Sequence, residues 1–277
     1  MAAVNRFIAT LRDQRFACAV LAALLVSFSA ASAQDWARAA LDKSPRHGEW
    51  VTLKHGDRSL KAYIVYPEVS KKTAAVVVVH EIYGLTDWAR EVTDEVAAAG
   101  YIAIVPDLLS GHGPNGSGSD GFADNQARVP VVAQLDPAAV TADLNAAADY
   151  VKNLPSANGK VAVAGFCWGG GESFRFATAR HDLSAAFVFY GETPKNLAAI
   201  TAPVYAFYAG NDERIDATIP ATQIAMRTAG KTYQEVTYAG AGHGFMRSGE
   251  DPGNTNPDNK VARDTAWARW RTLLGRL

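Results

Sequence analysis

The chain has 277 residues, 48% of them hydrophobic and 20% charged, so it is long enough and apolar enough to bury one large core. Lysine and arginine total 27 against 28 aspartate and glutamate, a net charge of −1, which excludes the strongly basic surface typical of nucleic-acid-binding proteins. Only two cysteines are present, which excludes a disulfide-rich scaffold.

The first 33 residues differ in composition from the rest. Basic residues precede an apolar stretch, CAVLAALLVSFSA, which is followed by the small-residue triplet Ala31-Ser32-Ala33. This arrangement predicts a secretory signal peptide over 1–33, cleaved after Ala33. A membrane anchor is the alternative, although the apolar run is short for a bilayer. We therefore expect an exported protein, periplasmic or secreted, with no stable membrane anchor after cleavage and one domain over 34–277.

Cleavage at this position also removes one of the two cysteines. Cys18 lies inside the predicted signal peptide, so Cys167 remains alone and cannot form an internal disulfide. A solitary thiol in an oxidising compartment is exposed to oxidation and to pairing with other molecules. Its presence there indicates a functional use.

The predicted domain begins with a hairpin and a buried strand. Residues 50–55 and 60–66 alternate between polar and apolar side chains around the turn His55-Gly56-Asp57-Arg58, which predicts an antiparallel hairpin. Residues 73–80 are almost continuously apolar, as in a strand that is buried on both faces of a parallel sheet.

The rest of the chain alternates between predicted strands and helices. This order predicts an α/β fold with a single doubly wound, mostly parallel sheet, helices on both faces and the antiparallel hairpin at its N-terminal side. The predicted elements are a helix over 86–100, a strand over 101–105, a helix over 136–153, strands over 161–165, 185–190, 204–209 and 232–238, and helices over 172–180, 215–229 and 257–274.

Residues 110–120 are rich in glycine and contain G-H-G-P-N-G, which matches the dinucleotide-binding pattern G-x-G-x-x-G. That pattern must lead from a strand directly into a helix, and here Pro106 and further loop residues intervene. We expect a mobile surface loop beside the functional site instead.

Residues 161–171 read V-A-V-A-G-F-C-W-G-G-G and predict a strand, a sharp turn at Cys167 and a helix. The spacing is that of the nucleophile elbow G-x-S-x-G, with cysteine in place of serine. A thiolate at a helix N-terminus faces unpaired N–H groups, so we expect a lowered pKa for Cys167. The alternative is a small, buried core cysteine.

A cysteine nucleophile needs a base and a residue that orients the base. In proteins with this elbow the chain order is nucleophile, acid, histidine, on loops that follow successive strands. Asp212 follows the strand over 204–209, and His243 follows the strand over 232–238, so both fit this order. Asp216 is the alternative acid, although it more naturally opens the next helix. The histidines that do not fit this order are His47, His55, His80, His112 and His181.

An oxyanion needs hydrogen-bond donors close to the nucleophile. The backbone N–H of Trp168, next to Cys167, and that of Ile82, in the loop after the first buried strand, are the expected donors. Glu81 in the same loop is unexpected, because its charge would oppose a thiolate. A surface salt bridge is the alternative role for Glu81.

The motifs H-E-I-Y-G-L, G-F-C-W-G-G and G-H-G-F, together with the Asp212 loop, resemble the dienelactone hydrolase family (carboxymethylenebutenolidases) of the α/β-hydrolase fold. The similarity extends from about Trp50 to the C-terminus. It implies a triad of Cys167, Asp212 and His243 that cleaves an ester or lactone through a thioester, with no cofactor and no metal.

The resemblance also implies roles for charged residues around the thiol. The glutamate that matches Glu81 bonds the thiol at rest and helps to ionise it when substrate binds. Two arginines hold a substrate carboxylate, which implies this role for Arg247 and, in the loop after Asp107, for Arg128. Tyr83 is expected to line the same substrate site.

Three alternatives remain open at this point. A broad-specificity exported thiol carboxylesterase would differ only in substrate and would depend little on Arg128 or Arg247. A peptidase of the same fold would need a propeller or a large cap, for which we find no segment. A non-catalytic hydrolase-fold binding protein would keep the pocket without the chemistry. The predicted signal peptide is the departure from the best-known family members, which work in the cytoplasm on intermediates of aromatic degradation.

Overall fold

The computed structural model of the protein describes residues 34–277, and the predicted signal peptide lies outside them. Eight strands form one sheet in the order β1-β2-β4-β3-β5-β6-β7-β8. The pairs β1–β2 and β2–β4 are antiparallel and all the others are parallel. The strands are β1 (Gly48–His55), β2 (Arg58–Val65), β3 (Thr73–Val79), β4 (Ile102–Pro106), β5 (Ala157–Phe166), β6 (Ala185–Phe189), β7 (Val204–Ala209) and β8 (Tyr233–Tyr238).

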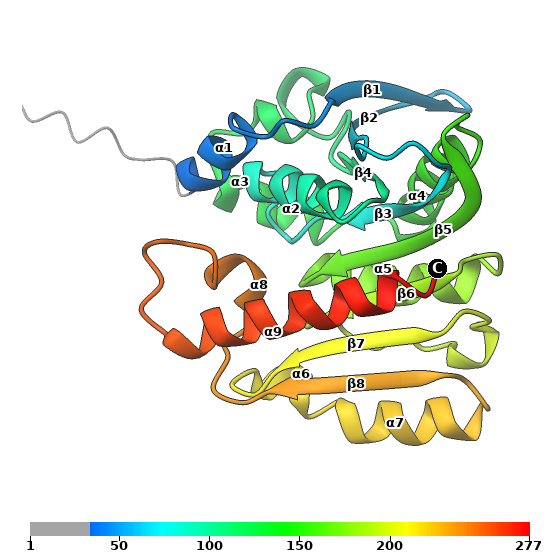
Figure 1. The fold of residues 1–277 in the computed structure, drawn as a ribbon, viewed down its shortest axis with the longest axis vertical. Coiled ribbons are helices and arrows are strands. Elements are labelled where there is room, and N and C mark those ends of the chain that lie inside the picture. The colour runs from blue at the N-terminus through cyan, green and yellow to red at the C-terminus, as the bar shows by residue number, and fades with distance from the viewer. Residues whose placement is uncertain (1–33) are drawn as a thin grey trace, which may run out of the picture. The chain divides into compact units, whose positions relative to one another are not determined.

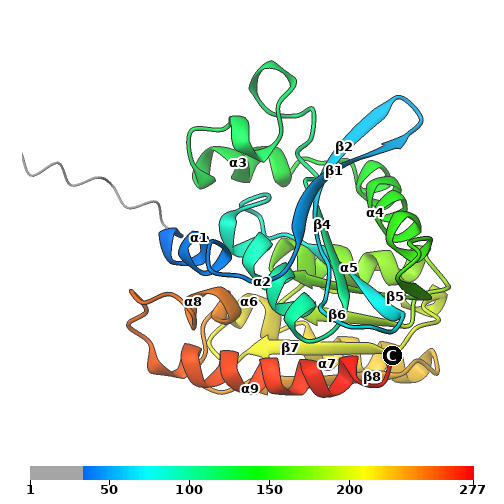
Figure 2. The same cartoon turned by 45° about the horizontal axis from the view of Figure 1, so that its top comes forward.

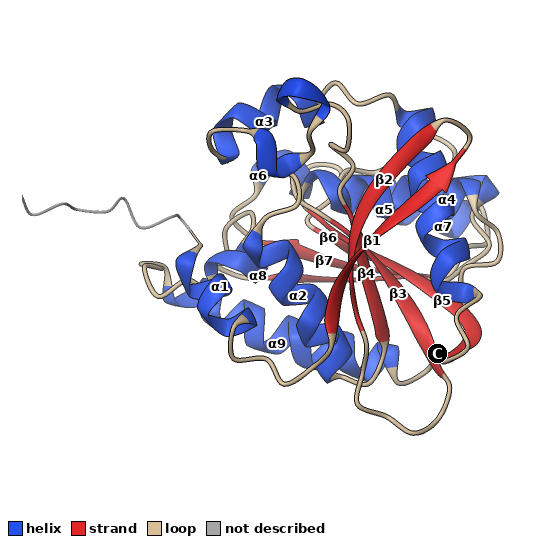
Figure 3. Cartoon of the chain, turned by 90° about the horizontal axis from the view of Figure 1, so that it is seen from above, coloured by secondary structure: helices blue, strands red, loops and turns tan. Residues whose placement is uncertain are grey.

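Helices cover both faces of the sheet, which confirms the predicted α/β architecture (Figure 1). Helices α4, α5 and α7 pack on one face, and α1, α2, α8 and α9 pack on the other (Figure 3). The helices are α1 (Asp35–Leu41), α2 (Asp87–Ala98), α3 (Asn125–Val132), α4 (Pro137–Lys152), α5 (Trp168–Ala179), α6 (Glu213–Asp216), α7 (Ile219–Thr228), α8 (Phe245–Ser248) and α9 (Pro257–Leu274). Within residues 34–277, no helix combines the length and apolar character needed to cross a membrane.

The apolar run of β3 explains its central place in the sheet. All seven of its residues are buried, because helices cover both faces of this strand. Burying one valine side chain contributes roughly 1.5–3 kcal/mol, so such a run is stable only between two layers. The carboxyl end of β3 is thereby fixed beside that of β5, with which it pairs in parallel.

Two parts of the helical pattern differ from the sequence prediction. The single helix predicted over 215–229 is wrong, because the chain forms α6 and α7 with a break between them. Pro220 lies in the first turn of α7 and has no N–H to continue a preceding helix. Helices α1, α3 and α8 were not predicted; α1 and α8 are only seven and four residues long, and α3 contains Pro130.

The glycine-rich segment over 110–120 is hydrogen-bonded at Ser119 to Asp107, the residue after β4. The carboxylate of Asp107 accepts hydrogen bonds from the backbone N–H of Ser119 at 2.8 Å and from its hydroxyl at 2.6 Å. That hydroxyl in turn accepts from the N–H of Leu85 at 2.9 Å. The segment continues through two short 3₁₀ turns to α3, which stands outside the two helical layers (Figure 2).

Candidate active site

The predicted site residues lie on loops at one edge of the sheet. Glu81 and Ile82 follow β3, Cys167 follows β5, Asp212 follows β7 and His243 follows β8. These strands are parallel, so their carboxyl ends meet at the same edge, where ligands bind in open α/β sheets.

The turn between β5 and α5 has the geometry of a nucleophile elbow. Cys167 has φ 57° and ψ −120°, an unusual backbone conformation for a residue with a side chain. The turn is tight enough that a Cβ on Gly165 would collide with the carbonyl oxygen of Gly169, and one on Gly169 would collide with that of His80. The glycines therefore let the elbow pass close to the end of β3 and present the thiol at the sheet edge.

The thiol, the imidazole and the carboxylate make a continuous chain of contacts. The sulfur of Cys167 lies 3.1 Å from Nε2 of His243, and Nδ1 of His243 lies 2.5 Å from Oδ2 of Asp212. A carboxylate accepts the Nδ1 proton, which leaves the Nε2 lone pair facing the thiol. Asp216, the alternative acid, ends α6 instead of opening the next helix, and its Oδ1 has no partner among the described residues.

Two backbone N–H groups also face the sulfur of Cys167. They belong to Trp168, the first residue of α5, and to Ile82 in the loop after β3. Both hydrogen bonds favour the charged form of the thiol. The sequence had pointed to these same two groups as oxyanion donors.

The pKa of Cys167 is nevertheless raised, to about 11, and the predicted lowering is wrong. Burial is the largest cause, and the negative charge of Glu81 adds to it. The N–H groups of Trp168 and Ile82 act in the opposite direction but do not outweigh burial. The thiol is therefore protonated at neutral pH, and a base must remove its proton before it can attack.

Glu81 forms a buried ion pair. Its Oε2 accepts a hydrogen bond from Nε of Arg247 at 2.7 Å, and Glu81 is only 3% exposed. The surface salt bridge considered from sequence is thus wrong. In this structure Glu81 bonds Arg247 and Cys167 bonds His243, so the bond between Glu81 and the thiol that the family resemblance implies is not seen. The pKa of Arg247 is raised, chiefly by the charge of Glu81.

The two predicted substrate-binding arginines meet at Tyr83. The guanidinium of Arg247 lies 5.4 Å from the centre of the Tyr83 ring. Arg128, on α3, donates from Nη1 to the carbonyl oxygen of Tyr83 at 3.2 Å and to Oδ1 of Asn125 at 2.9 Å. Burial lowers the pKa of Arg128. Two cations and an aromatic ring therefore adjoin the loop that carries Glu81 and Ile82.

Sequence reasoning missed Tyr190, which follows β6 and is fully buried. Its ring lies edge-on to the imidazole of His243, with centroids 5.1 Å apart, and edge-on to Phe245 at 5.2 Å. Its φ of 40° is rare for a residue with a large side chain. The available signal was its position at the end of a predicted parallel strand.

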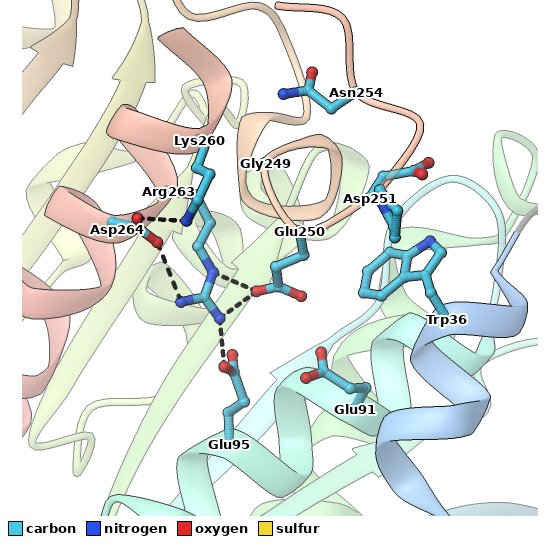
Figure 4. Close-up of a pocket in the computed structure, with 11 residues that line it drawn as sticks. Trp36, Glu91, Glu95, Gly249, Glu250, Asp251, Asn254, Lys260, Arg263 and Asp264 are labelled. Carbon is cyan, nitrogen blue, oxygen red and sulfur yellow. Dashed lines mark hydrogen bonds and ion pairs between the residues drawn. The ribbon is translucent and has the colours of Figure 1, made fainter. Parts of the chain in front are cut away.

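A second group of charged residues lines a pocket that includes none of the predicted triad (Figure 4). Carboxylate oxygens of Glu91, Glu95 and Glu250 lie within 4.8 Å of one another, and Arg263 pairs with both Glu95 and Glu250. Burial is the largest cause that raises the pKa of Glu91 to about 11 and that of Glu95 to about 7. Protonation of Glu91 and the positive charge of Arg263 therefore together offset the repulsion among the three glutamates of this pocket.

Replacing Glu81 with Gln tests the electrostatic account of the thiol. The change removes a negative charge that opposes the thiolate, so the pH midpoint for alkylation of Cys167 by iodoacetamide should fall by roughly 1 unit. Alkylation rates measured from pH 7 to beyond pH 12 give this midpoint for both proteins. Glu49→Gln, at a half-buried position of β1 outside the candidate site, is the matched control and should leave the midpoint unchanged. An unchanged or higher midpoint in Glu81→Gln would contradict the account.

Known proteins are similar to this chain in sequence and in fold. The model of the dienelactone hydrolase family matches residues 60–277. A relative from Methylorubrum extorquens, provisionally named a carboxymethylenebutenolidase, is 32% identical over 209 residues, which cover 70% of this chain and 71% of that protein. Carboxymethylenebutenolidase 1 of Cupriavidus pinatubonensis is 30% identical over 237 residues, which cover 83% and 97%.

A solved structure agrees at the level of the fold. A Klebsiella pneumoniae protein, provisionally named a dienelactone hydrolase, superposes with a TM-score of 0.73 at 24% identity and covers 84% of this chain and 99% of its own. The family match begins at Leu60 within β2 and spans the later strands and all the loops that carry the candidate site. The chain therefore belongs to the dienelactone hydrolase family, a family of ester- and lactone-cleaving hydrolases with an α/β-hydrolase fold.

Proposed function

We propose that the protein hydrolyses a carboxylic ester or lactone with Cys167 as the nucleophile, through a thioester on that residue. The observation that supports this most directly is the contact chain from the Cys167 sulfur to His243, at 3.1 Å, and from His243 to Asp212, at 2.5 Å. This is the arrangement that nucleophilic catalysis requires: a nucleophile within reach of a base, and a base oriented by a third group.

In the first half of the reaction, Nε2 of His243 accepts the thiol proton as the sulfur attacks the carbonyl carbon. The carbonyl π electrons move to oxygen, and the N–H groups of Ile82 and Trp168 stabilise the oxyanion. Each such donor contributes about 2.7–4 kcal/mol in the transition state. The intermediate then collapses, the carbon–oxygen bond breaks, and the proton on Nε2 passes to the leaving alcohol oxygen. The acyl group is left as a thioester on Cys167.

In the second half, water replaces the leaving group. Nε2 of His243 takes a proton from the water as its oxygen attacks the thioester carbonyl. The same two N–H groups stabilise the second oxyanion. When this intermediate collapses, the carbon–sulfur bond breaks, the sulfur recovers its proton from His243, and the acid is released. No cofactor or metal enters this scheme.

The charges near the thiol favour a substrate that carries a carboxylate. Arg247 and Arg128 lie around Tyr83, in the loop that also supplies the Ile82 donor. A substrate carboxylate that binds Arg247 would compete with Glu81 for the same guanidinium. A broad-specificity thiol carboxylesterase is the second candidate, because the charge of Arg247 is already matched by Glu81 in this structure.

Arg247→Ala separates the two candidates. The ratio of kcat/KM for a carboxylate-bearing lactone to that for a neutral lactone of the same size should fall about 10- to 100-fold, since one charge-assisted hydrogen bond is lost. Any effect of the substitution on the reactivity of the Cys167 thiol applies to both substrates, so it cancels in this ratio. Arg38→Ala, at an exposed position of α1, is the control. An unchanged ratio in Arg247→Ala would favour the broad esterase. Absence of turnover by the wild-type protein on every ester and lactone would favour a binding protein.

We also propose that the protein is exported and acts in the periplasm or outside the cell. The sequence pattern of residues 1–33 supports this proposal. Cell fractionation followed by N-terminal sequencing should find the protein outside the cytoplasm with Gln34 as its first residue. A cytoplasmic protein that retains Met1 would contradict it.

A further inference from the structure

His80 lies directly after β3 and takes no part in the proposed reaction, yet it is fully buried beside the oxyanion donors. Its Nδ1 lies 2.8 Å from the carbonyl oxygen of Glu81. A carbonyl oxygen can only accept, so Nδ1 carries the proton and Nε2 carries the lone pair. Burial lowers the pKa of His80, which keeps the ring neutral at pH 7.

The hydrogen bond from His80 acts on the same peptide group that supplies one oxyanion donor. The carbonyl of Glu81 and the N–H of Ile82 belong to a single planar, trans peptide unit, in which they point in opposite directions. The bond that fixes the carbonyl therefore also fixes the direction of the Ile82 N–H, which faces the sulfur of Cys167. The N–H of Gly84 donates to the same carbonyl at 3.1 Å.

The ring of His80 also contacts the residue that supplies the second donor. It stacks on the indole of Trp168, with ring centroids 5.7 Å apart and an interplanar angle of 19°. The backbone N–H of Trp168 is the other group that faces the sulfur. One buried imidazole is thus in contact with both sides of the oxyanion site.

The second nitrogen of His80 makes this arrangement costly. Nε2 is buried and has no hydrogen-bond partner within residues 34–277. Leaving a buried acceptor unpaired costs free energy that an apolar ring of similar size would avoid. Packing alone is therefore a poor explanation for a histidine here, and the bond made by Nδ1 is the compensating contact.

From these contacts we propose that His80 is a positioning residue that holds the backbone donors of Ile82 and Trp168 toward the reacting carbonyl oxygen. The proposal rests on the proposed thiol mechanism. It assigns His80 no contact with substrate and no proton transfer. Its effect is confined to steps that develop an oxyanion.

The test compares ester acylation with alkylation of the same thiol. Alkylation by iodoacetamide displaces iodide without forming an oxyanion, so the ratio of the acylation rate to the alkylation rate at one pH reports the oxyanion site alone. His80→Phe keeps a stacking ring and removes the donor. We expect this ratio to fall about 10- to 100-fold, in the range for weakening one donor of an oxyanion site. The melting temperature should be unchanged or higher, because the unpaired Nε2 is gone.

Two further variants keep the test decisive if His80→Phe does not fold. The side-chain N–H of asparagine reaches the position of Nδ1, whereas that of glutamine reaches the position of Nε2. His80→Asn should therefore restore most of the ratio and His80→Gln should not. Tyr238→Phe, which removes another buried polar atom without a partner, is the matched control and should leave the ratio unchanged.

The outcomes separate this inference from the proposed function. A ratio in His80→Phe within about twofold of wild type, or equal ratios in the Asn and Gln variants, would overturn the role of His80 while leaving the thiol mechanism intact. Full ester turnover by Cys167→Ala would instead overturn the mechanism itself.

Discussion

Cys167→Ala should lower kcat/KM for ester hydrolysis by about 10⁴-fold or more, because residues 34–277 contain no other cysteine that could form the thioester. The sulfur is in contact with the imidazole of His243 and with two backbone N–H groups, so its removal takes away the centre of the site. The measurement is steady-state turnover of a p-nitrophenyl ester with protein that is free of wild-type contamination.

The fold should survive this substitution, since alanine is smaller than cysteine and leaves the glycines of the elbow in place. Near-UV circular dichroism and the melting temperature of Cys167→Ala provide this control. Activity within tenfold of wild type in a folded variant would show that another residue supplies the nucleophile.

Asp212→Asn should lower kcat by about 10⁴-fold while changing KM little. The carboxylate accepts the Nδ1 proton of His243, and an amide that turns its NH₂ toward Nδ1 would favour the tautomer with the proton on Nε2. The imidazole could then no longer accept the thiol proton. Turnover of a neutral ester across pH 6 to 9 measures the effect.

Asp216→Asn is the matched control for this change. Asp216 lies four residues further along the chain, in α6, and makes no contact with His243 among the described residues. Its removal should alter kcat by less than about threefold, since it makes no hydrogen bond to His243 and acts on Asp212 only through its charge. Equal losses of kcat in the two variants would mean that the negative charge of this region sets the rate, and that the orientation of His243 by Asp212 does not.

The sequence predicted the elements that have strong local signals. The helix over 257–274 and the strand over 204–209 have the predicted bounds, because each has a continuous periodic pattern with a clear start. The division between α6 and α7 depends on how Pro220 is used, and α1 is too short to show a period. The anchoring of the segment over 110–120 depends on Asp107, a contact that local patterns do not encode.

The candidate site was predictable to the extent that chain order determines it. In a parallel sheet, loops that follow successive strands meet at one edge, so Asp212 and His243 could be placed from the order of the elements. The ion pairs and pKa shifts of the site could not be predicted in this way. The partner of Glu81 lies 166 residues away in the chain, and the pKa of Cys167 depends on a burial that only tertiary packing creates.

His80 shows the same limit from another side. Among the six histidines, chain order selected His243 and set His80 aside, because His80 precedes the nucleophile. Its position against Trp168 follows from the pairing of β3 with β5, which brings the loop after β3 next to the elbow.

The most direct test of the thiol mechanism is mass spectrometry of the enzyme quenched with acid during turnover of a slow ester. The account predicts that the peptide containing Cys167 gains the mass of the acyl group and that hydroxylamine removes this group. If His243→Ala is acylated by an activated thioester, it should retain the acyl group for longer than the wild-type protein. Continued turnover with no acyl group on Cys167, or with the acyl group on another residue, would contradict the account.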